Sequence, residues 1–270
     1  MTVHNFKWNF AGKEIRFGMD LDPASATDSE MLTAIRVAGY PEFEVVELFS
    51  RVLKPGDYAI DGGANIGFFT LLASVLVGEE GYVLSIEPGI NNLPSLKANI
   101  KLNKLTNIEV VPHPLWSKRE AVQLHLCPDG SKNSMAPHAG TRGLSILEAV
   151  TLNDYATEEI RPRLKLIKLD IEGVELEALK AATDLLREPD RCPFIVMELN
   201  IEALPKFDAS VEKIRDFMRQ FGYDMFMLNF NGALPVYVPR HTTVVPNRLN
   251  WNALFSTFED VSRAWPEIWT

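Results

Sequence analysis

Hydrophobic positions along this chain follow two periods, one typical of strands and one typical of helices. Near the amino terminus, apolar and polar residues alternate on both sides of Ala11-Gly12, in the stretch FKWNFAGKEIRFGM. Alternation with a period of two across a short turn predicts a β-hairpin. Apolar residues at helical spacing then predict two helices, over about residues 28–38 and 41–53.

From about residue 56 onward, short apolar strands alternate with helical patterns. The strand signals are YAID, GYVLSIEP, IEVVPHP, LKLIKLD and CPFIVMEL, and FFTLLASVLV and residues 173–186 are two of the helical patterns between them. Parallel strands need helical crossovers, so the order predicts a doubly wound α/β sheet covered on both faces. After a helix over about 209–221, YDMFMLNF and GALPVYVP predict an antiparallel hairpin across Asn231-Gly232.

Two segments depart from this regular alternation. Residues 128–144 lack periodicity and are rich in Gly, Ser and Asn, which predicts a mobile surface loop and a candidate lid over the ligand-binding edge. Residues 246–270 form an aromatic-rich tail expected to pack on the body of the protein. The expected parts are therefore 1–53, a hairpin and helices packing on the core, then 54–245, the α/β domain, and then 246–270, the tail.

Composition narrows the functional classes. The chain has 46% hydrophobic and 23% charged residues, typical of a globular protein with a large core. Its formal net charge of -9 argues against nucleic acid as a partner, because such binding relies on Lys and Arg contacts to phosphate. No apolar window suits a signal peptide or a membrane span, so a soluble cytoplasmic protein without membrane contact is expected. Cys127 and Cys192 predict buried thiols rather than a disulfide framework.

The glycine-rich turn DGGANIG, residues 61–67, follows the first strand of the predicted sheet, where open α/β sheets bind ligands. A dinucleotide fingerprint is present only in the weakened form GxAxxG, with Ala64 in the middle position. S-adenosylmethionine is the other candidate ligand, because Asp61 could face its ammonium group and would repel a pyrophosphate. Close approach of the ligand needs Gly63 and Gly67, and Asn65 tolerates a left-handed conformation. A plain tight turn with a helix cap is the structural alternative.

Glu87 ends the second strand of the predicted sheet, and Pro88 follows it. A carboxylate in this place can accept both ribose hydroxyls of an adenosine, a feature that dinucleotide and S-adenosylmethionine sites share. Pro88 suits a turn that places apolar surface against adenine. A solvated charge at a strand end would explain Glu87 without a ligand.

A second cluster lies in IKLDIEGVE, where Lys168 and Asp170 share one face of a strand and Glu172 begins the next helix. A lysine in an apolar strand should be paired, and Asp170 is the nearest partner. Glu198, near the end of the fifth strand, would bring another carboxylate to the same edge. Asp170, with Lys168 beside it, is the first candidate for a catalytic base, followed by Glu172 and Glu198. The neighbouring Glu175 has a simpler explanation as an acid that complements the helix dipole.

Metal chemistry is not required by this pattern. A divalent ion held by Asp170 and Glu198 is an alternative, and zinc is not expected because no histidine accompanies them in sequence. His113 and His138 could serve as bases, although a structural role suits each of them better. The sequence pattern therefore predicts no metal ligand.

These residues resemble one known family. The stretches GDYAIDGGANIGFFT, IEPGINNLPSLKANIKLN, TLNDY, LIKLDIEGVELEALKAA and FIVMELN are similar to the FkbM-type S-adenosylmethionine-dependent methyltransferases, over about residues 40–230. The resemblance implies a class I methyltransferase (Rossmann-like) fold, in which a seven-stranded sheet ends in an antiparallel hairpin, with residues 54–245 as the methyltransferase domain. It also implies methyl transfer to a hydroxyl oxygen of a small molecule, such as a natural product or a sugar. By position, Asp61, Gly63, Asn65 and Gly67 match the cofactor turn, Glu87 the ribose acid, and Lys168, Asp170 and Glu172 the active-edge motif.

Two other functions remain open from the sequence. A nicotinamide-dependent oxidoreductase would explain the glycine turn and Glu87 but would leave Lys168, Asp170 and Glu172 without a role. An enzyme that uses S-adenosylmethionine for another reaction, such as ring closure, would share all of these residues. The acceptor and the oligomeric state do not follow from the sequence.

Overall fold

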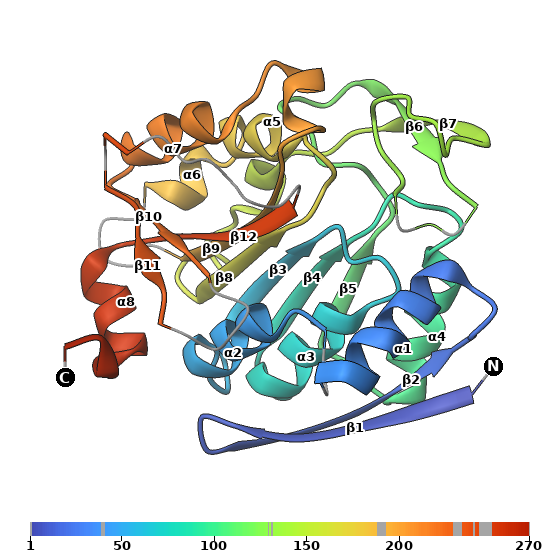
Figure 1. The fold of residues 1–270 in the computed structure, drawn as a ribbon, viewed down its shortest axis with the longest axis horizontal. Coiled ribbons are helices and arrows are strands. Elements are labelled where there is room, and N and C mark those ends of the chain that lie inside the picture. Colours follow the sequence, from blue (N-terminus) through green and yellow to red (C-terminus); the bar gives the residue numbers. More distant parts are fainter. Residues whose placement is uncertain are drawn as a thin grey trace.

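The fold is a three-layer α/β arrangement with one large central sheet (Figure 1). A computed structural model describes residues 2–38, 41–128, 130, 132–187, 193–228, 234–239, 241–242 and 250–269. In spatial order, the strands of the sheet are β11 (Val236–Tyr237), β10 (Asp224–Met227), β12 (Asn250–Ser256), β9 (Phe194–Asn200), β8 (Leu164–Leu169), β3 (Tyr58–Gly62), β4 (Tyr82–Ile86) and β5 (Ile108–Val111). Strands β9, β8, β3, β4 and β5 run parallel, and the other three pair antiparallel. The predicted doubly wound α/β sheet is confirmed.

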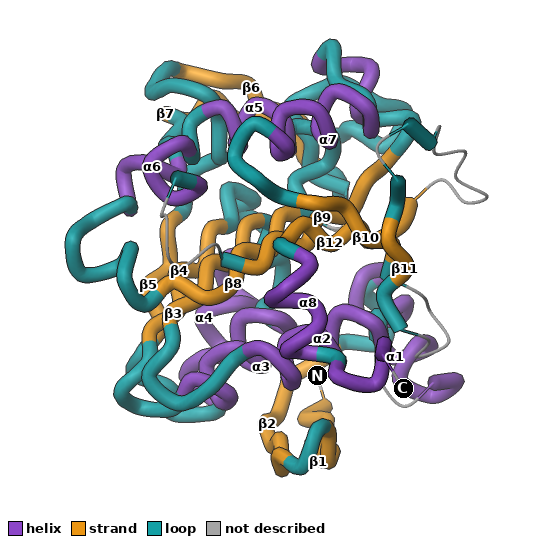
Figure 2. The backbone as a smooth tube through the Cα atoms, turned by 90° about the vertical axis from the view of Figure 1, so that its left-hand side faces the viewer, coloured by secondary structure: helices purple, strands orange, loops and turns teal. Residues whose placement is uncertain are grey.

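Helices cover both faces of this sheet (Figure 2). One face carries α1 (Ala26–Ala38), α2 (Phe43–Val52), α3 (Phe68–Val77), α4 (Leu93–Leu102) and α8 (Phe258–Ala264). The other carries α5 (Glu175–Lys180), α6 (Thr183–Leu186) and α7 (Val211–Arg219). Short 3-10 helices occur at Leu152–Tyr155, Leu204–Phe207 and Pro266–Trp269. No helix in the described ranges is both long and apolar enough to cross a membrane.

The amino-terminal hairpin is present as predicted, with β1 (Thr2–Phe10) paired to β2 (Lys13–Leu21). Ala11 and Gly12 both have positive φ, at 48° and 75°, the geometry of a two-residue hairpin turn. The hairpin lies outside the helical layer, where Phe6 and Phe17 pack on Phe68 of α3 with ring centroids 6.0 and 5.6 Å apart. Because the hairpin covers α3 from outside, this helix is apolar almost all round.

The strands from the carboxyl-terminal part of the chain differ from the prediction. Strands β10 and β11 pair as the predicted antiparallel hairpin, but β12 lies between β9 and β10, so the sheet has eight strands in the described ranges rather than seven. β12 comes from the segment 246–270, and all its residues from Trp251 to Ser256 are buried. This interior strand packs side chains into both layers, with Trp251 and Phe255 in the core on one face of the sheet and Leu254 in the core on the other. The predicted turn at Asn231-Gly232 lies outside the described residues.

Beyond the carboxyl edge of the sheet lies a separate antiparallel pair, β6 (Ala121–Leu126) and β7 (Gly143–Glu148). The loop between these strands contains most of residues 128–144. An isolated bridge between His125 and Ser134 ties this loop back to β6. The described part of this loop therefore lies next to the sheet edge where ligands bind in this class of fold.

Candidate active site

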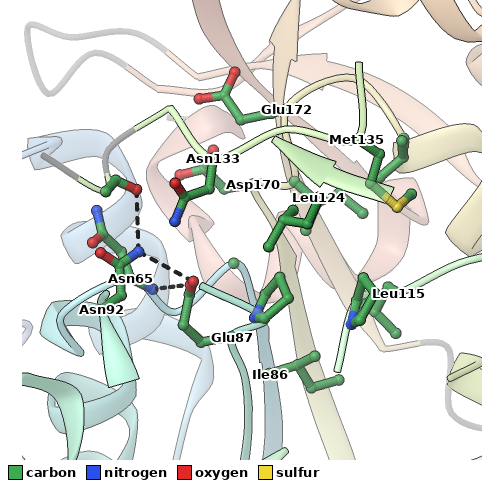
Figure 3. A pocket seen from close by; sticks show the side chains of 16 residues that line it. Asn65, Ile86, Glu87, Asn92, Leu115, Leu124, Asn133, Met135, Asp170 and Glu172 are labelled. Atoms are coloured by element: carbon green, nitrogen blue, oxygen red, sulfur yellow. Dashed lines mark hydrogen bonds between the residues drawn. The ribbon is translucent and has the colours of Figure 1, made fainter. Parts of the chain in front are cut away.

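A cavity opens at the carboxyl ends of β3, β4 and β8 (Figure 3). Its empty space is about 620 Å³, a figure that includes space open to solvent. The lining residues are Gly63, Asn65, Ile86, Glu87, Pro88, Asn92, Pro114, Leu115, Leu124, Gly130, Asn133, Met135, Asp170, Ile171, Glu172 and Val174. An apolar wall from Ile86, Leu115, Leu124 and Met135 thus faces a small number of polar groups.

The glycine turn is held tightly between two strand ends. The amides of Gly63 and Ala64 donate to the carbonyl oxygen of Ile86 at 2.9 and 3.1 Å. Gly63 has a φ of 82°, and a Cβ atom there would lie 1.8 Å from the carbonyl oxygen of Asp170. Asn65 has a φ of 51°, which confirms the predicted left-handed conformation. Gly67, also at positive φ, lies against Leu96, and a Cβ atom there would lie 2.7 Å from Leu96 Cδ1.

Glu87 is buried at the floor of the cavity, and three donors converge on its carboxylate. Oε2 accepts from the Asn65 amide at 2.7 Å, while Oε1 accepts from the Gly89 amide at 2.8 Å and from Asn92 Nδ2 at 3.1 Å (Figure 3). Burial raises the pKa of Glu87 to about 7, although these hydrogen bonds oppose that shift. Pro88 lies beside it in the cavity wall. The arrangement suits recognition of hydroxyl groups at this end of the cavity.

Asp61 has a different position from the one expected. Its side chain is only 1% exposed and does not line the cavity. Oδ2 accepts a hydrogen bond from Thr70 Oγ1 at 2.6 Å, and Oδ1 has no hydrogen-bond partner among the described residues. Burial raises the pKa of Asp61, while the nearby Lys168 opposes the rise. Asp61 therefore supports the turn and balances Lys168 from below the cavity.

Lys168 and Asp170 form the expected pair, with Lys168 Nζ 3.0 Å from Asp170 Oδ2. Lys168 is 3% exposed, and its ammonium group lies 4.8 Å from the centre of the Phe69 ring. Burial alone would lower the pKa of Lys168, but the negative charges of Asp170, Glu42 and Asp61 outweigh it and raise the pKa. Lys168 is thus a fixed positive charge that holds Asp170 at the cavity wall.

Glu172 lines the cavity from a strained turn. It has a φ of 56°, and burial, followed by the charges of Asp170 and Glu175, raises its pKa to about 8. Glu175 Oε1 holds this turn together by accepting from the Ile171 and Gly173 amides, each at 3.2 Å. Glu175 is almost fully buried, so the simple helix-dipole explanation from the sequence is incomplete.

Glu198 also reaches this edge of the sheet. The β8–β9 register places Leu169 beside Met197, so Asp170 and Glu198 are the next neighbours along the two strands. The charge of Asp170 and then burial raise the pKa of Glu198 to about 9. The structure therefore brings together the four predicted residues Lys168, Asp170, Glu172 and Glu198.

Several residues of this region did not emerge from the sequence. Glu42, at the start of α2, joins the carboxylate group near Lys168, where burial raises its pKa to about 7. The loop after β6 contributes Gly130, Asn133 and Met135 to the cavity wall. Asn92 Nδ2 also donates to the Gly130 carbonyl oxygen at 3.1 Å, so the loop is tied to the residue that contacts Glu87. An asparagine pair before α4 was the available signal, although its partners are far away in sequence.

The two histidines considered as bases lie elsewhere. His113 Nδ1 is 2.9 Å from the Glu148 carbonyl oxygen, and His138 Nε2 is 3.3 Å from Cys127 Sγ. Neither lines the cavity. Cys127 is buried as predicted, and Cys192 lies outside the described residues. Within the described ranges, no group of three or more His, Cys, Asp or Glu side chains is arranged to hold a metal ion.

Comparison with known proteins identifies a family. The family model of the methyltransferase FkbM domain matches residues 61–225, more than half of the chain. No curated protein matches the sequence. Among solved structures, a protein from Clostridium thermocellum assigned as an rRNA methylase is 10% identical, with a TM-score of 0.49 over 79% of this chain and 93% of that one. A methyltransferase FkbM from Methylobacillus flagellatus KT is 17% identical, with a TM-score of 0.48 over 87% of this chain and 56% of that one.

Proposed function

This chain belongs to the methyltransferase FkbM domain family, and from that premise we propose that it methylates a hydroxyl oxygen of a small molecule. The cofactor is S-adenosylmethionine. The observation that carries the proposal is the position of Asp170, whose carboxylate lines the cofactor cavity while the buried Lys168 holds it in place. The nicotinamide-dependent alternative is set aside, because the family is one of methyltransferases.

The residues of the cavity fit this cofactor. Glu87 offers a buried carboxylate to the ribose hydroxyls, and the apolar wall with Pro88 suits an adenine ring. The close approach of Gly63 to Asp170 leaves no room for a side chain between the turn and the end of β8. Asn65 Oδ1 is buried without a hydrogen-bond partner among the described residues, so it can accept from a donor on the ligand.

When bound, S-adenosylmethionine supplies a methyl group already activated by the positive sulfur. The protein must align an acceptor lone pair with that group, exclude water and remove the acceptor's proton. Asp170 is the proposed base: one of its oxygens would take the hydroxyl proton as the acceptor oxygen bonds to the methyl carbon and the carbon–sulfur bond of the methyl donor breaks. Lys168 keeps the carboxylate oriented, and Glu172 lies on the same cavity wall to position the acceptor.

Methyl transfer can be tested directly. Purified protein should bind S-adenosylmethionine in a calorimetric titration, and incubation with a small-molecule extract should yield a methyl ether carrying the label of a deuterated methyl donor. Asp170→Asn keeps the shape of the side chain and removes the base, so the rate should fall by roughly 10² to 10⁴. Affinity for S-adenosylhomocysteine should change much less in the same variant.

The outcomes separate the open alternatives. Full turnover by Asp170→Asn together with loss of activity in Glu172→Gln or Glu198→Gln would move the base to another carboxylate. A product with no added methyl mass would show that the enzyme uses the cofactor for a different reaction. A product that carries the labelled methyl group on nitrogen instead of oxygen would contradict O-methylation.

A further inference from the structure

A row of polar side chains lies at the cavity end of one face of the sheet, the face that packs against α2 and α3. On this face, Leu166, Val196 and Leu254 belong to the hydrophobic core. Two residues nearer the cavity, the same three strands carry Lys168, Glu198 and Asn252, and the β9–β12 register pairs Asn252 with Glu198. Since side chains two apart on a strand share a face, all three project toward the α2 layer.

Glu42 joins this row from the start of α2. Its Oε2 accepts a hydrogen bond from Asn252 Nδ2 at 3.1 Å. The same amide nitrogen donates to Glu44 Oε1 at 3.0 Å. Glu42 has a φ of 42°, an uncommon backbone conformation for a residue other than glycine and one that clusters at functional sites.

A buried atom in this group lacks a partner. Glu44 is 3% exposed, and its Oε2 has no hydrogen-bond partner among the described residues. A buried carboxylate oxygen without a donor carries a desolvation cost, and a donor supplied by a ligand would remove it. The unpartnered oxygen of Glu44 does not depend on the charges of the neighbouring residues, and it points to a hydroxyl or amine group that binds here.

The charges of the row are unbalanced. Lys168 carries a positive charge in this row, and the negative charges of three carboxylates act on it, those of Asp170, Glu42 and Asp61. Burial and the charge of Asp170 raise the pKa of Glu42, and Asp170 and Glu42 both raise the pKa of Glu198. Each carboxyl group therefore resists further negative charge, while a protonated one can donate a hydrogen bond.

We propose that Glu42, Asn252 and Glu198 form the acceptor subsite beside Asp170, and that it takes a hydroxyl-bearing acceptor without phosphate, sulfate or carboxylate groups. Carboxylate oxygens receive hydrogen bonds from the hydroxyls of such a molecule, and Asp170 connects the subsite to the cofactor cavity. An anionic acceptor would bring a further negative charge beside Asp170 and Glu42, which opposes binding. This inference rests on the proposed function. It adds Glu42, which precedes the matched residues 61–225, to the site.

Cysteine labelling tests the subsite without knowledge of the acceptor. Glu42→Cys is treated separately with a trimethylammonium and a sulfonate form of methanethiosulfonate ethyl reagent, and modification at each cysteine is followed by peptide mass spectrometry. Glu259→Cys, at the exposed start of α8, is the matched control for the intrinsic reactivity of the two reagents. The ratio of the labelling rates, cationic reagent over anionic reagent, is divided by the same ratio at the control cysteine. At position 42 this normalised ratio should be at least about ten. Glu198→Cys, tested in parallel, should show the same preference.

Two results would overturn the subsite. One is a normalised rate ratio near one at both positions. The other is absence of labelling at both positions under conditions that label Glu259→Cys fully, in protein that still melts cooperatively. Saturating S-adenosylhomocysteine should leave the charge preference in place, because the subsite lies beyond the cofactor.

Charge selection is tested on the reaction itself. A small-molecule extract is divided on anion-exchange resin at neutral pH, and each fraction is incubated with the enzyme and deuterated S-adenosylmethionine. Labelled product should come from the fraction that passes the resin, and product only from the retained fraction would overturn the inference. If no fraction gives product, the proposed function fails, whereas the labelling ratio still decides the charge of the subsite.

Discussion

Replacement of Glu87 by Ala should weaken binding of S-adenosylhomocysteine by about 2 to 3 kcal/mol, or about 30- to 160-fold in Kd. In the structure, the carboxylate already receives three donors, two on Oε1 and one on Oε2. A carboxylate offers about four acceptor positions, so one ribose hydroxyl can bind Oε2 directly. A second hydroxyl requires the 3.1 Å contact from Asn92, the longest of the three, to open.

The magnitude follows from what the substitution removes. Hydrogen bonds to a charged group contribute about 1.5 to 3 kcal/mol each, and part of that is lost to the cost of displacing Asn92. The Asn65 and Gly89 amides would then face the cavity, where water can reach them, so the fold should tolerate the change. Burial also raises the pKa of Glu87, so its removal relieves an unfavourable buried charge at pH 8.

Isothermal titration calorimetry with S-adenosylhomocysteine and its 2′-deoxyribose analogue measures this effect. The wild type should lose affinity for the deoxy analogue, while Glu87→Ala should bind the two ligands with nearly equal affinity. Glu79→Ala, an exposed glutamate after α3, is the matched control and should bind like the wild type. An unchanged Kd in a cooperatively folded Glu87→Ala protein would remove Glu87 from the cofactor site.

Three further predictions concern the fold around the site. Gly63→Ala should lower the free energy of unfolding in urea by more than about 3 kcal/mol, because its Cβ would lie 1.8 Å from a backbone oxygen. Gly12→Ala is the control: it has a similar φ of 75° but open space around it, and it should cost about 1 to 2 kcal/mol. Glu175→Gln retains an acceptor for two backbone amides and should cost under about 1 kcal/mol, but Glu175→Ala leaves both buried amides unpaired and should cost about 2 to 3 kcal/mol; equal losses would contradict this role. The pKa of Glu198 is raised from 4.5 to about 9 in the folded state. Between these two values the folded state binds more protons than the unfolded state, so stability should fall as pH rises. The Tm of the unliganded protein should therefore decrease from pH 5.5 to 8.5, and Glu198→Gln should flatten that slope.

Local patterns in the sequence were sufficient for the hairpin, for α1 and α2, and for the alternation of strands and helices that defines the fold class. Each of these depends on contacts between residues close in sequence or on a repeated apolar period. The conformation of Asn65 was also predictable, because a glycine-rich turn at a strand end limits the backbone to few shapes. Pairing of Lys168 with Asp170 followed from their shared strand face.

Only the tertiary structure decided which distant segments meet at the carboxyl edge. The sequence placed β12 in a tail, yet it pairs with β9 because an apolar strand gains most when both of its faces and both of its edges are buried. That pairing brings Asn252 to Glu42, residues separated by 210 positions. Long-range packing also decided the position of Asp61: its carboxylate accepts a hydrogen bond from Thr70 and lies near the charge of Lys168, outside the cavity lining. Periodicity records which face of an element is buried, whereas strand order and charge neighbours arise from long-range packing that no local pattern encodes.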